Sequence, residues 1–197
     1  MSFIDLESKL QQKYIIGVDE VGRGCFMGPM VVGFYIYHND LIRIEGLNDS
    51  KKLTAKKRAA LCGDLKQTSK FLLVPIPSNF IDLYGLNLGY LYAFKRFCTY
   101  FNFDLNDCMF LLDYGIKTPV LKYSQHFKKG DSTCYSIAAA SVLAKVYRDN
   151  IMCNLEKLYP EFAPSTHKGY GTKKHRDILS QTSPSVLHRL SFLNEYK

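Results

Sequence analysis

Short runs of apolar and β-branched residues alternate along this chain with segments in which apolar residues recur every three or four positions. The apolar runs predict strands over residues 14–18, 29–37, 70–76 and 109–112. The helical spacing predicts helices over residues 3–12, 55–67, 86–101, 132–157 and 173–180. Strands that alternate with helices are typical of an α/β fold with a central sheet, and the first two strands are expected to pair as a hairpin.

The longest predicted helix has the clearest pattern. Its expected buried stripe comprises Ile137, Ala140, Ala144, Tyr147, Ile151, Leu155 and Leu158. Residues 138–140 are all alanine, which would let this helix approach a sheet or another helix closely. The aromatic face over 86–101 is expected to lie in the core. Side-chain N-caps are expected from Ser2, Thr54 and Thr172.

Composition favours one soluble domain that binds a polyanion. The 197 residues are 47% hydrophobic and carry a net charge of +8, and no linker or repeat divides them. We expect a single catalytic domain over 1–197, with about 160–197 as a C-terminal substrate-binding segment. Six scattered cysteines without a Cys-x-x-Cys pair indicate reduced thiols, and no signal peptide or membrane span is visible. The expected location is therefore the cytoplasm.

Two carboxylates and a glycine-rich loop follow the first predicted strand. Asp19 and Glu20 stand at its tip, and Gly22, Arg23 and Gly24 come directly after. Bare backbone amides beside a guanidinium suit a phosphate or a sugar hydroxyl. The alternative interpretation is an ordinary hairpin loop with one Asp–Arg surface pair.

Two further acids lie at the ends of predicted elements. Asp113 ends an apolar strand, and Asp131 stands at the entry of the long helix, where a simple capping role would also explain it. If these acids converge with Asp19 and Glu20, they would raise one another's pKa unless cations neutralise them. Oxygen ligands select Mg²⁺ or Mn²⁺, and two such ions would support phosphodiester hydrolysis without a protein nucleophile.

Basic and aromatic residues could hold the polyanion. Lys51 and Lys52 lie in the loop before Thr54, where a phosphate contact is plausible. Lys168 and Tyr170 belong to a second polar loop that is basic and punctuated by glycine. A basic loop with an aromatic ring suits a sugar-phosphate backbone. The residues alone therefore indicate a metal-dependent phosphodiesterase that acts on nucleic acid.

Six segments resemble the motifs of ribonuclease HII, and they follow the order of that family. Together they span roughly residues 14–192. They are Gly17-Val18-Asp19-Glu20-Val21-Gly22-Arg23-Gly24, Asp49-Ser50-Lys51-Lys52-Leu53, Lys129-Gly130-Asp131 with Ile137-Ala138-Ala139-Ala140-Ser141 and Ala144-Lys145, Arg148-Asp149, His167-Lys168-Gly169-Tyr170-Gly171-Thr172, and His188-Arg189 with Ser191-Phe192.

The resemblance implies a ribonuclease H-like fold, with a five-stranded mixed sheet flanked by helices and a helical C-terminal portion. It implies an endonuclease that cuts the RNA strand of RNA–DNA hybrids and cuts 5′ to a single ribonucleotide in duplex DNA. Two Mg²⁺ or Mn²⁺ ions would be held by Asp19, Glu20, Asp113 and Asp131. The implied substrate-binding residues are Gly22, Arg23, Gly24, Ser50, Lys51, Lys52, Lys168 and Tyr170. A monomer is expected, and a sliding-clamp partner stays open.

Two positions depart from the family pattern. Residues 25–27 are Cys-Phe-Met where the family usually has proline and small residues, which could alter junction recognition. Tyr114 separates Asp113 from Gly115, so Asp107 is the alternative fourth acid. A non-catalytic relative or a structure-specific DNA nuclease of the same fold is the alternative function. The sister family ribonuclease HIII usually has lysine at the place of Arg23.

Overall fold

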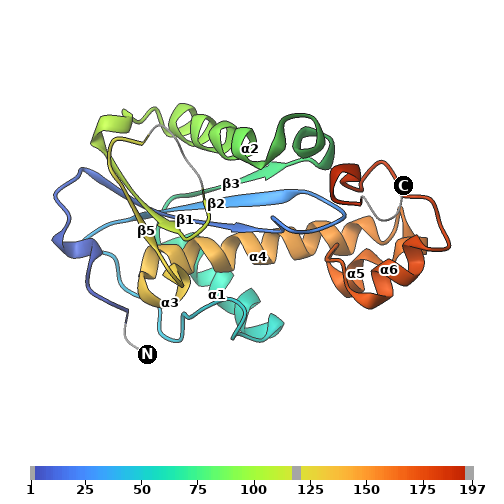
Figure 1. The fold of residues 1–197 in the computed structure, drawn as a ribbon. Helices are drawn as coiled ribbons and strands as arrows, with labels where there is room; N and C mark the ends of the chain where they lie inside the picture. The colour runs from blue at the N-terminus through green and yellow to red at the C-terminus, as the bar shows by residue number, and fades with distance from the viewer. Residues whose placement is uncertain (1–2, 117–120, 194–197) are drawn as a thin grey trace.

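A computed structural model describes residues 3–116 and 121–193, and its centre is a five-stranded sheet (Figure 1). The strands are β1 (Tyr14–Val21), β2 (Met30–Tyr37), β3 (Phe71–Ile76), β4 (Cys108–Asp113) and β5 (Ser124–Phe127), in the spatial order β3-β2-β1-β4-β5. β3, β2 and β1 pair antiparallel, whereas β1, β4 and β5 pair parallel. The mixed sheet and the β1–β2 hairpin are therefore confirmed.

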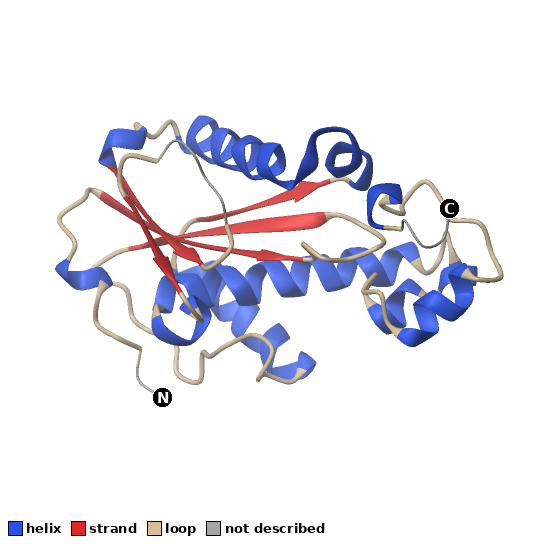
Figure 2. Ribbon diagram, in the orientation of Figure 1, coloured by secondary structure: helices blue, strands red, loops and turns tan. Residues whose placement is uncertain are grey.

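Helices cover both faces of this sheet. α2 (Ser78–Phe101) lies on one face, while α1 (Ala55–Thr68) and the long α4 (Tyr135–Leu155) lie on the other (Figure 2). The short α3 (Gly130–Thr133) precedes α4, and α5 (Pro164–His167) and α6 (Lys173–Leu179) lie together near the C-terminal end of the described chain. Single 3₁₀ turns occur at Glu7–Lys9, Leu105–Asp107, Pro160–Phe162 and Leu190–Phe192. No helix in the described ranges is long and apolar enough to cross a bilayer.

The alternation of side chains along β1 divides the interior into two cores. Ile15 packs with α1 and α4, whereas Ile16 and Val18 pack with the aromatic face of α2. That aromatic face is buried, as predicted, and it includes Tyr90, Phe94 and Phe97. On the α4 side, Gly17 brings β1 so close that a Cβ there would lie 2.1 Å from the backbone carbon of Ser136.

Three predicted helices differ from the structure. The prediction of a helix over 3–12 is wrong, since only the Glu7–Lys9 turn is helical there. Ser2, the N-cap predicted for that helix, lies outside the described residues. Tertiary contact explains this difference, because buried Glu7 accepts hydrogen bonds from the backbone N–H (2.9 Å) and hydroxyl (3.1 Å) of Ser136. The helix predicted to begin at residue 86 begins at Ser78, with a kink at Gly85, where φ is +76°.

The helix predicted over 132–157 is two helices. Cys134 is extended, with φ −112° and ψ 129°, and it separates α3 from α4. The predicted stripe holds in part, but Tyr147 in α4 is 39% exposed, and Leu158, which is 72% exposed, lies beyond the end of α4 at Leu155. The pattern also missed β5, whose Ser-Gln-His-Phe sequence lacks an apolar run.

The Gly17 contact makes a direct prediction about folding. Gly17→Ala would force β1 and α4 apart and is expected to lower the free energy of unfolding by about 3 kcal/mol. Gly63→Ala is the matched control, because a Cβ on Gly63 in α1 meets no atom within 4 Å. That change should stabilise the helix by up to about 1 kcal/mol. Urea unfolding of both variants measures the difference, and equal effects would contradict the close-contact argument.

Candidate active site

Sheet register brings Asp19 and Asp113 to the same level. The parallel pairing of β1 with β4 sets Val18 beside Leu112, so the next residue of each strand, Asp19 and Asp113, lies at the same end of the pair. β1 continues to Val21, and a cavity of about 330 Å³ is lined by both Asp19 and Glu20. Asp107 lies at the opposite end of β4 and is exposed, which removes it as the alternative acid at this edge.

Asp131 is joined to this edge through Asp113. The Asp113 Oδ1 atom accepts a hydrogen bond of 2.8 Å from the backbone N–H of Gly130, the residue before Asp131. Asp113 and Asp131 line an adjacent cavity of about 590 Å³, together with Asp49. The capping interpretation of Asp131 is wrong, since the residue before the helix is Lys129 and Asp131 lies inside the first turn. We call Asp19, Glu20, Asp113 and Asp131 the acid cluster.

Burial and mutual repulsion raise the pKa of three of these acids. Burial, followed by the charge of Glu20, raises the pKa of Asp19 well above its ordinary value. Burial raises the pKa of Glu20 to about 7, even though Arg23 acts in the opposite direction. The pKa of Asp131 rises to about 6 through burial and through Asp49. Such a cluster is stable in its ionised form only if cations lie close by.

The chemistry of the acid cluster fits a divalent cation. All its donors are carboxylate oxygens, which favour Mg²⁺ or Mn²⁺. The Tyr90 hydroxyl lies near enough to lower the pKa of Glu20, yet neither that hydroxyl nor the buried Glu20 Oε2 completes a hydrogen bond with a described residue. Within residues 3–116 and 121–193, however, no three His, Cys, Asp or Glu side chains already converge around one ion position. Arg23, 3.4 Å from Glu20 Oε1, and Lys51, near Asp131, supply the nearby positive charge.

Lysines surround the acids. Lys51, Lys52, Lys128 and Lys129 line the cavity that contains Asp113 and Asp131, and exposed Tyr114 stands beside them. Lys51 also lines the cavity that contains Asp19 and Glu20. Carboxylates inside a cavity with lysines around them suit a nucleic acid. The scissile phosphate could lie over cations held by the carboxylates, while the neighbouring phosphates contact lysine.

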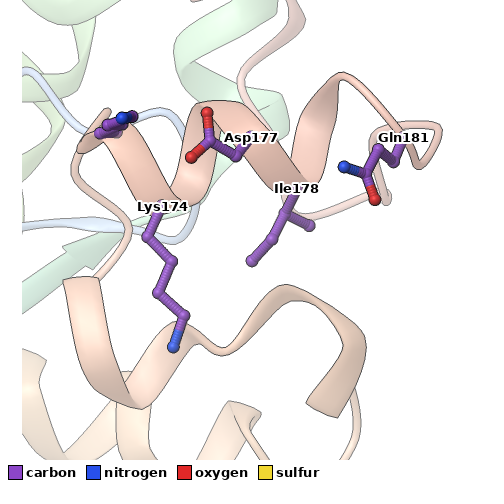
Figure 3. A pocket seen from close by; sticks show the side chains of 5 residues that line it. Lys174, Asp177, Ile178 and Gln181 are labelled. Atoms are coloured by element: carbon purple, nitrogen blue, oxygen red, sulfur yellow. The ribbon is translucent and has the colours of Figure 1, made fainter.

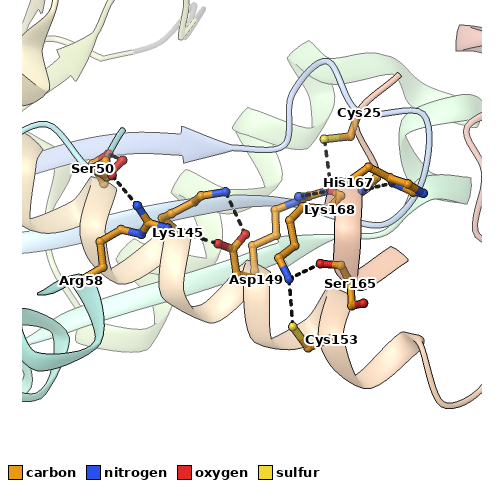
Figure 4. A network of polar contacts seen from close by, with 12 residues as sticks. Cys25, Ser50, Arg58, Lys145, Asp149, Cys153, Ser165, His167 and Lys168 are labelled. Atoms are coloured by element: carbon orange, nitrogen blue, oxygen red, sulfur yellow. Dashed lines mark hydrogen bonds and ion pairs between the residues drawn. The ribbon is translucent and has the colours of Figure 1, made fainter. Parts of the chain in front are cut away.

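A polar network holds the loop of Ser50 and Lys51 against α4 (Figure 4). Arg58 donates to the Ser50 carbonyl at 2.9 Å and lies 3.9 Å from Asp149, which accepts from Lys145 at 2.8 Å. Ser50 itself is buried, and its hydroxyl accepts from Ser141 at 2.9 Å. Ser141 in turn lowers the pKa of Asp19 by hydrogen bonding. Ser50 therefore supports the acid cluster from behind.

The three residues of the Gly-Arg-Gly sequence have different environments. Gly22 is buried, with φ +87°, and a Cβ there would lie 2.1 Å from Arg148. Gly24 is exposed, and a Cβ there would meet no atom within 4 Å. Arg23 is also exposed and lies over Gly115. Folding therefore requires glycine at position 22, whereas no contact of a described residue requires it at position 24.

Two fully buried arginines fix residues 22–29, which we call the glycine loop. Arg148 donates to the carbonyls of Pro29 (2.7 Å), Lys168 (2.7 Å) and Met27 (3.2 Å). Arg189 donates to the carbonyl of Arg23 at 2.7 Å and to that of Gly28 at 3.2 and 2.9 Å. Neither guanidinium forms an ion pair with a described residue, so carbonyl dipoles hold both charges.

The structure brings Tyr170 to the acids but turns Lys168 away. Tyr170 lines the cavity of Asp19 and Glu20, and Lys145 and Arg148 lie 5.8 and 5.6 Å from its ring centre. Burial and Cys25 raise its pKa to about 12. The Lys168 Nζ atom contacts the Cys153 sulfur (2.9 Å) and the Ser165 carbonyl (2.7 Å), as Figure 4 shows.

The unusual residues 25–27 join the two loops. Cys25 and Met27 are fully buried, and the Phe26 N–H donates to the Gly169 carbonyl at 2.8 Å. The Phe26 ring lies so close to Gly171 that a Cβ there would come within 2.5 Å. These side chains thus fill the contact between the glycine loop and the loop of Tyr170 without moving either away from the acids.

A separate cavity of about 440 Å³ lies along α6 and offers no comparable chemistry (Figure 3). Its lining contains a single acid, Asp177, beside Lys173, Lys174, Ile178 and Gln181. One carboxylate flanked by two lysines is a poor metal site.

Several site residues were not predicted from the sequence. Asp49, Ser141, Lys145, Arg148 and Arg189 all occur in the motif segments, but spacing gave no reason to assign them a role. Tyr90 was predicted only as a core residue. The available signal was the chemical type of each residue, since buried serine, lysine and arginine on a helix that covers a sheet require polar partners.

Known proteins that are similar to this chain belong to one family. The sequence profile of the family described as Ribonuclease HII matches residues 16–93 and 116–195, so Asp113 falls between the matched segments. A Ribonuclease HII of Caldicellulosiruptor bescii is 38% identical over 197 residues, which covers 98% of this chain and 94% of the relative. A Ribonuclease HII of Campylobacter concisus is 38% identical over 184 residues and covers 91% of this chain and 92% of the relative.

Solved structures show the same fold. The RNase HII in the PCNA:RNase HII complex from Archaeoglobus fulgidus has a TM-score of 0.72 and 21% identity, covering 93% of this chain and 96% of that chain. Bst-RNase HIII in complex with Mn²⁺ has a TM-score of 0.67 and 16% identity, covering 90% of this chain and 73% of that chain. At these identities the likeness establishes the fold.

The raised pKa of Glu20 predicts how stability depends on pH and cations. Its folded pKa of about 7 exceeds the ordinary 4.5, so burial of the carboxylate costs stability that increases as pH rises through this range. Glu20→Gln is therefore expected to raise Tm in EDTA at pH 8 by several degrees, at roughly 2–4 °C per kcal/mol. In Mg²⁺ the wild type should gain more Tm than the variant.

Asp107→Asn is the matched control, because Asp107 is an exposed acid at the other end of β4. Its Tm should follow the wild type in both buffers. Thermal melts with and without Mg²⁺ at pH 5 and pH 8 make the comparison. A lower Tm for Glu20→Gln in EDTA at pH 8 would contradict the electrostatic argument.

Proposed function

Because this chain belongs to the ribonuclease HII family and is therefore a ribonuclease H, we propose that it cuts the RNA strand of RNA–DNA hybrids and incises 5′ to a single ribonucleotide in duplex DNA. One observation carries the proposal. The cavity lined by Asp19 and Glu20 is also lined by Lys51, Lys145 and Tyr170. Groups suited to hydrolysis and groups suited to sugar recognition therefore share one site.

Asp19, Glu20, Asp113 and Asp131 would hold two divalent ions, Mg²⁺ or Mn²⁺. When bound, the ions would supply an activated water and would stabilise the leaving oxygen, which would give 5′-phosphate and 3′-hydroxyl ends. The protein's own part is to aim these carboxylates: β1 and β4 set the level of Asp19 and Asp113, and Gly130 orients Asp113. Burial keeps bulk water from screening their charge.

The chain's other residues would hold the nucleic acid. The backbone of Gly22, Arg23 and Gly24 would contact the ribose 2′-hydroxyl, the group that distinguishes RNA from DNA. The Tyr170 ring would pack on the sugar at the DNA side of the junction. Lys51 and Lys52 would contact phosphates, and Ser50 would hold their loop in place. Lys168 would act through the conformation of its loop, which positions the Tyr170 ring toward the substrate.

The first test is incision of a DNA duplex that contains one ribonucleotide. With Mg²⁺ or Mn²⁺ the wild type should cut 5′ to the ribonucleotide and leave an all-DNA duplex intact. EDTA should abolish cutting, and Asp19→Asn should lower kcat by at least about 10³-fold, because it removes a charged ligand from the ions. Binding without cutting would favour a non-catalytic relative, and cutting of all-DNA branched substrates would favour a DNA nuclease.

The second test separates Gly24 from Gly22. Gly24→Ala should leave Tm unchanged, since its Cβ meets no neighbour, but should lower incision at a single ribonucleotide roughly 10- to 100-fold by displacing the sugar. Gly22→Ala is the matched comparison and should lower Tm, because it requires φ +87° and overlaps Arg148. A Gly24→Ala enzyme with full incision activity would show that the sugar does not approach this glycine.

A further inference from the structure

Three buried histidines stand behind Tyr170, and the site described above does not use them. His167, His175 and His188 come from α5, α6 and the segment after α6. The rings of His167 and His175 stack at 4.0 Å with an interplanar angle of 9°. The His175 and His188 Nε2 atoms are 3.1 Å apart, so one of them must donate a proton to the other.

Backbone donors settle which nitrogen carries each proton. The Ser185 N–H donates to His188 Nδ1 at 3.0 Å, so His188 carries its own proton on Nε2 and donates it to His175 Nε2. His175 must then be protonated on Nδ1, which donates to the Tyr170 carbonyl at 3.0 Å. We call this chain from Ser185 to Tyr170 the histidine relay.

His167 is fixed in the same way and completes the support of the loop. The Gly169 N–H donates to its Nδ1 atom at 3.0 Å, so its Nε2–H donates to the Phe162 carbonyl at 2.7 Å. The His167 carbonyl accepts from the Tyr170 N–H at 3.0 Å. Both backbone groups of Tyr170 therefore bond to this histidine cluster, and the Tyr170 carbonyl also accepts from the Thr172 N–H at 2.8 Å.

The relay requires neutral rings. A second proton on His175 would place two N–H groups against each other across 3.1 Å, and a second proton on His188 would set its Nδ1–H against the Ser185 N–H across 3.0 Å. Burial lowers the pKa of both histidines to about 4, with His167 as a further cause, so both rings are neutral at pH 7. The charged groups around the cluster are Lys168, Lys174 and Glu156, which act on His167.

The relay also reaches the glycine loop. Met27 forms an isolated β-bridge with His188, and the Arg189 N–H donates to the Phe26 carbonyl at 2.7 Å. The Phe26 ring lies 5.9 Å from the ring of His175. The segment that holds the relay is thus bonded both to the loop with Gly24 and to the loop with Tyr170.

We propose that His175 and His188 are positioning residues for recognition of the RNA–DNA junction, because their relay fixes the backbone from which the Tyr170 ring projects. This inference rests on the proposed function. Long hybrids present ribose at every position and depend less on one sugar contact, whereas a single ribonucleotide has only one junction. Loss of the relay should therefore reduce incision at a single ribonucleotide more than cleavage of a long hybrid.

Two substitutions at His175 form a matched pair. The His175→Asn amide can place a donor where Nδ1 stands and so keeps the bond to Tyr170, while it loses the bond to His188. The His175→Gln amide reaches the Nε2 position and keeps the bond to His188, while it loses the one to Tyr170. Both remove one buried ring and one hydrogen bond, so both should lower Tm by similar amounts.

The measurement is kcat/KM on a single-ribonucleotide duplex divided by kcat/KM on a long hybrid. His175→Gln should lower this ratio about five- to tenfold, the loss expected for one buried hydrogen bond, and His175→Asn should largely retain it. Equal ratios in the two variants would overturn the inference. A wild type that fails to incise the single ribonucleotide would instead overturn the proposed function, on which the inference rests.

The proton positions give a second, activity-independent test. Two-bond ¹H–¹⁵N correlation spectra of the intact protein at pH 7 should show His175 protonated on Nδ1, and His167 and His188 protonated on Nε2. Any other tautomer at His175 or His188 would break the relay and overturn the inference.

Discussion

One close contact underlies the whole site: α4 runs against β1, β2 and the glycine loop. Positions 136, 140, 148 and 152 make this contact in order along α4, and the contact turns gradually around the helix because four residues slightly exceed one turn. Each meets a glycine at a distance that a Cβ could not tolerate: Gly17, Gly33, Gly22 and Gly28. Because the helix lies this close, the side chains of Ser141 and Lys145 reach the cavity of Asp19 and Glu20.

A second constraint is the balance of charge behind and around the acids. Burial alone would drive Asp19, Glu20 and Asp131 toward their protonated forms, which are poor metal ligands. Cations must offset this cost, and the chain itself supplies Arg23 and Lys51 at the rim. These two side chains are on loops, so a divalent ion can take over their role beside the carboxylates while they pair with a substrate phosphate, with little rearrangement of the sheet.

The sequence predicted the elements whose patterns are local and missed those that depend on distant partners. The apolar runs predicted β1 and β4, and hence the acids at their ends, because a buried strand needs a continuous apolar run. The break at Cys134, the single turn at Glu7–Lys9 in place of a full helix, and the polar strand β5 depend on tertiary contacts, which no window of sequence contains. A fifth strand was predicted only from the resemblance to the ribonuclease HII family.

The same difference explains which site residues could be predicted. Carboxylates at strand tips and glycines in a loop indicate chemistry by their type and position. The buried cations Arg148 and Arg189 do not, because their partners are backbone carbonyls, which every residue has. Those two arginines nonetheless fix the geometry of the loops: Arg148 joins α4 to both loops, and Arg189 joins the C-terminal segment to the glycine loop. The acids on the sheet and the two loops are therefore joined through backbone carbonyls, so a change in the Arg148 guanidinium acts on both loops, whereas a change in Arg189 acts on the glycine loop.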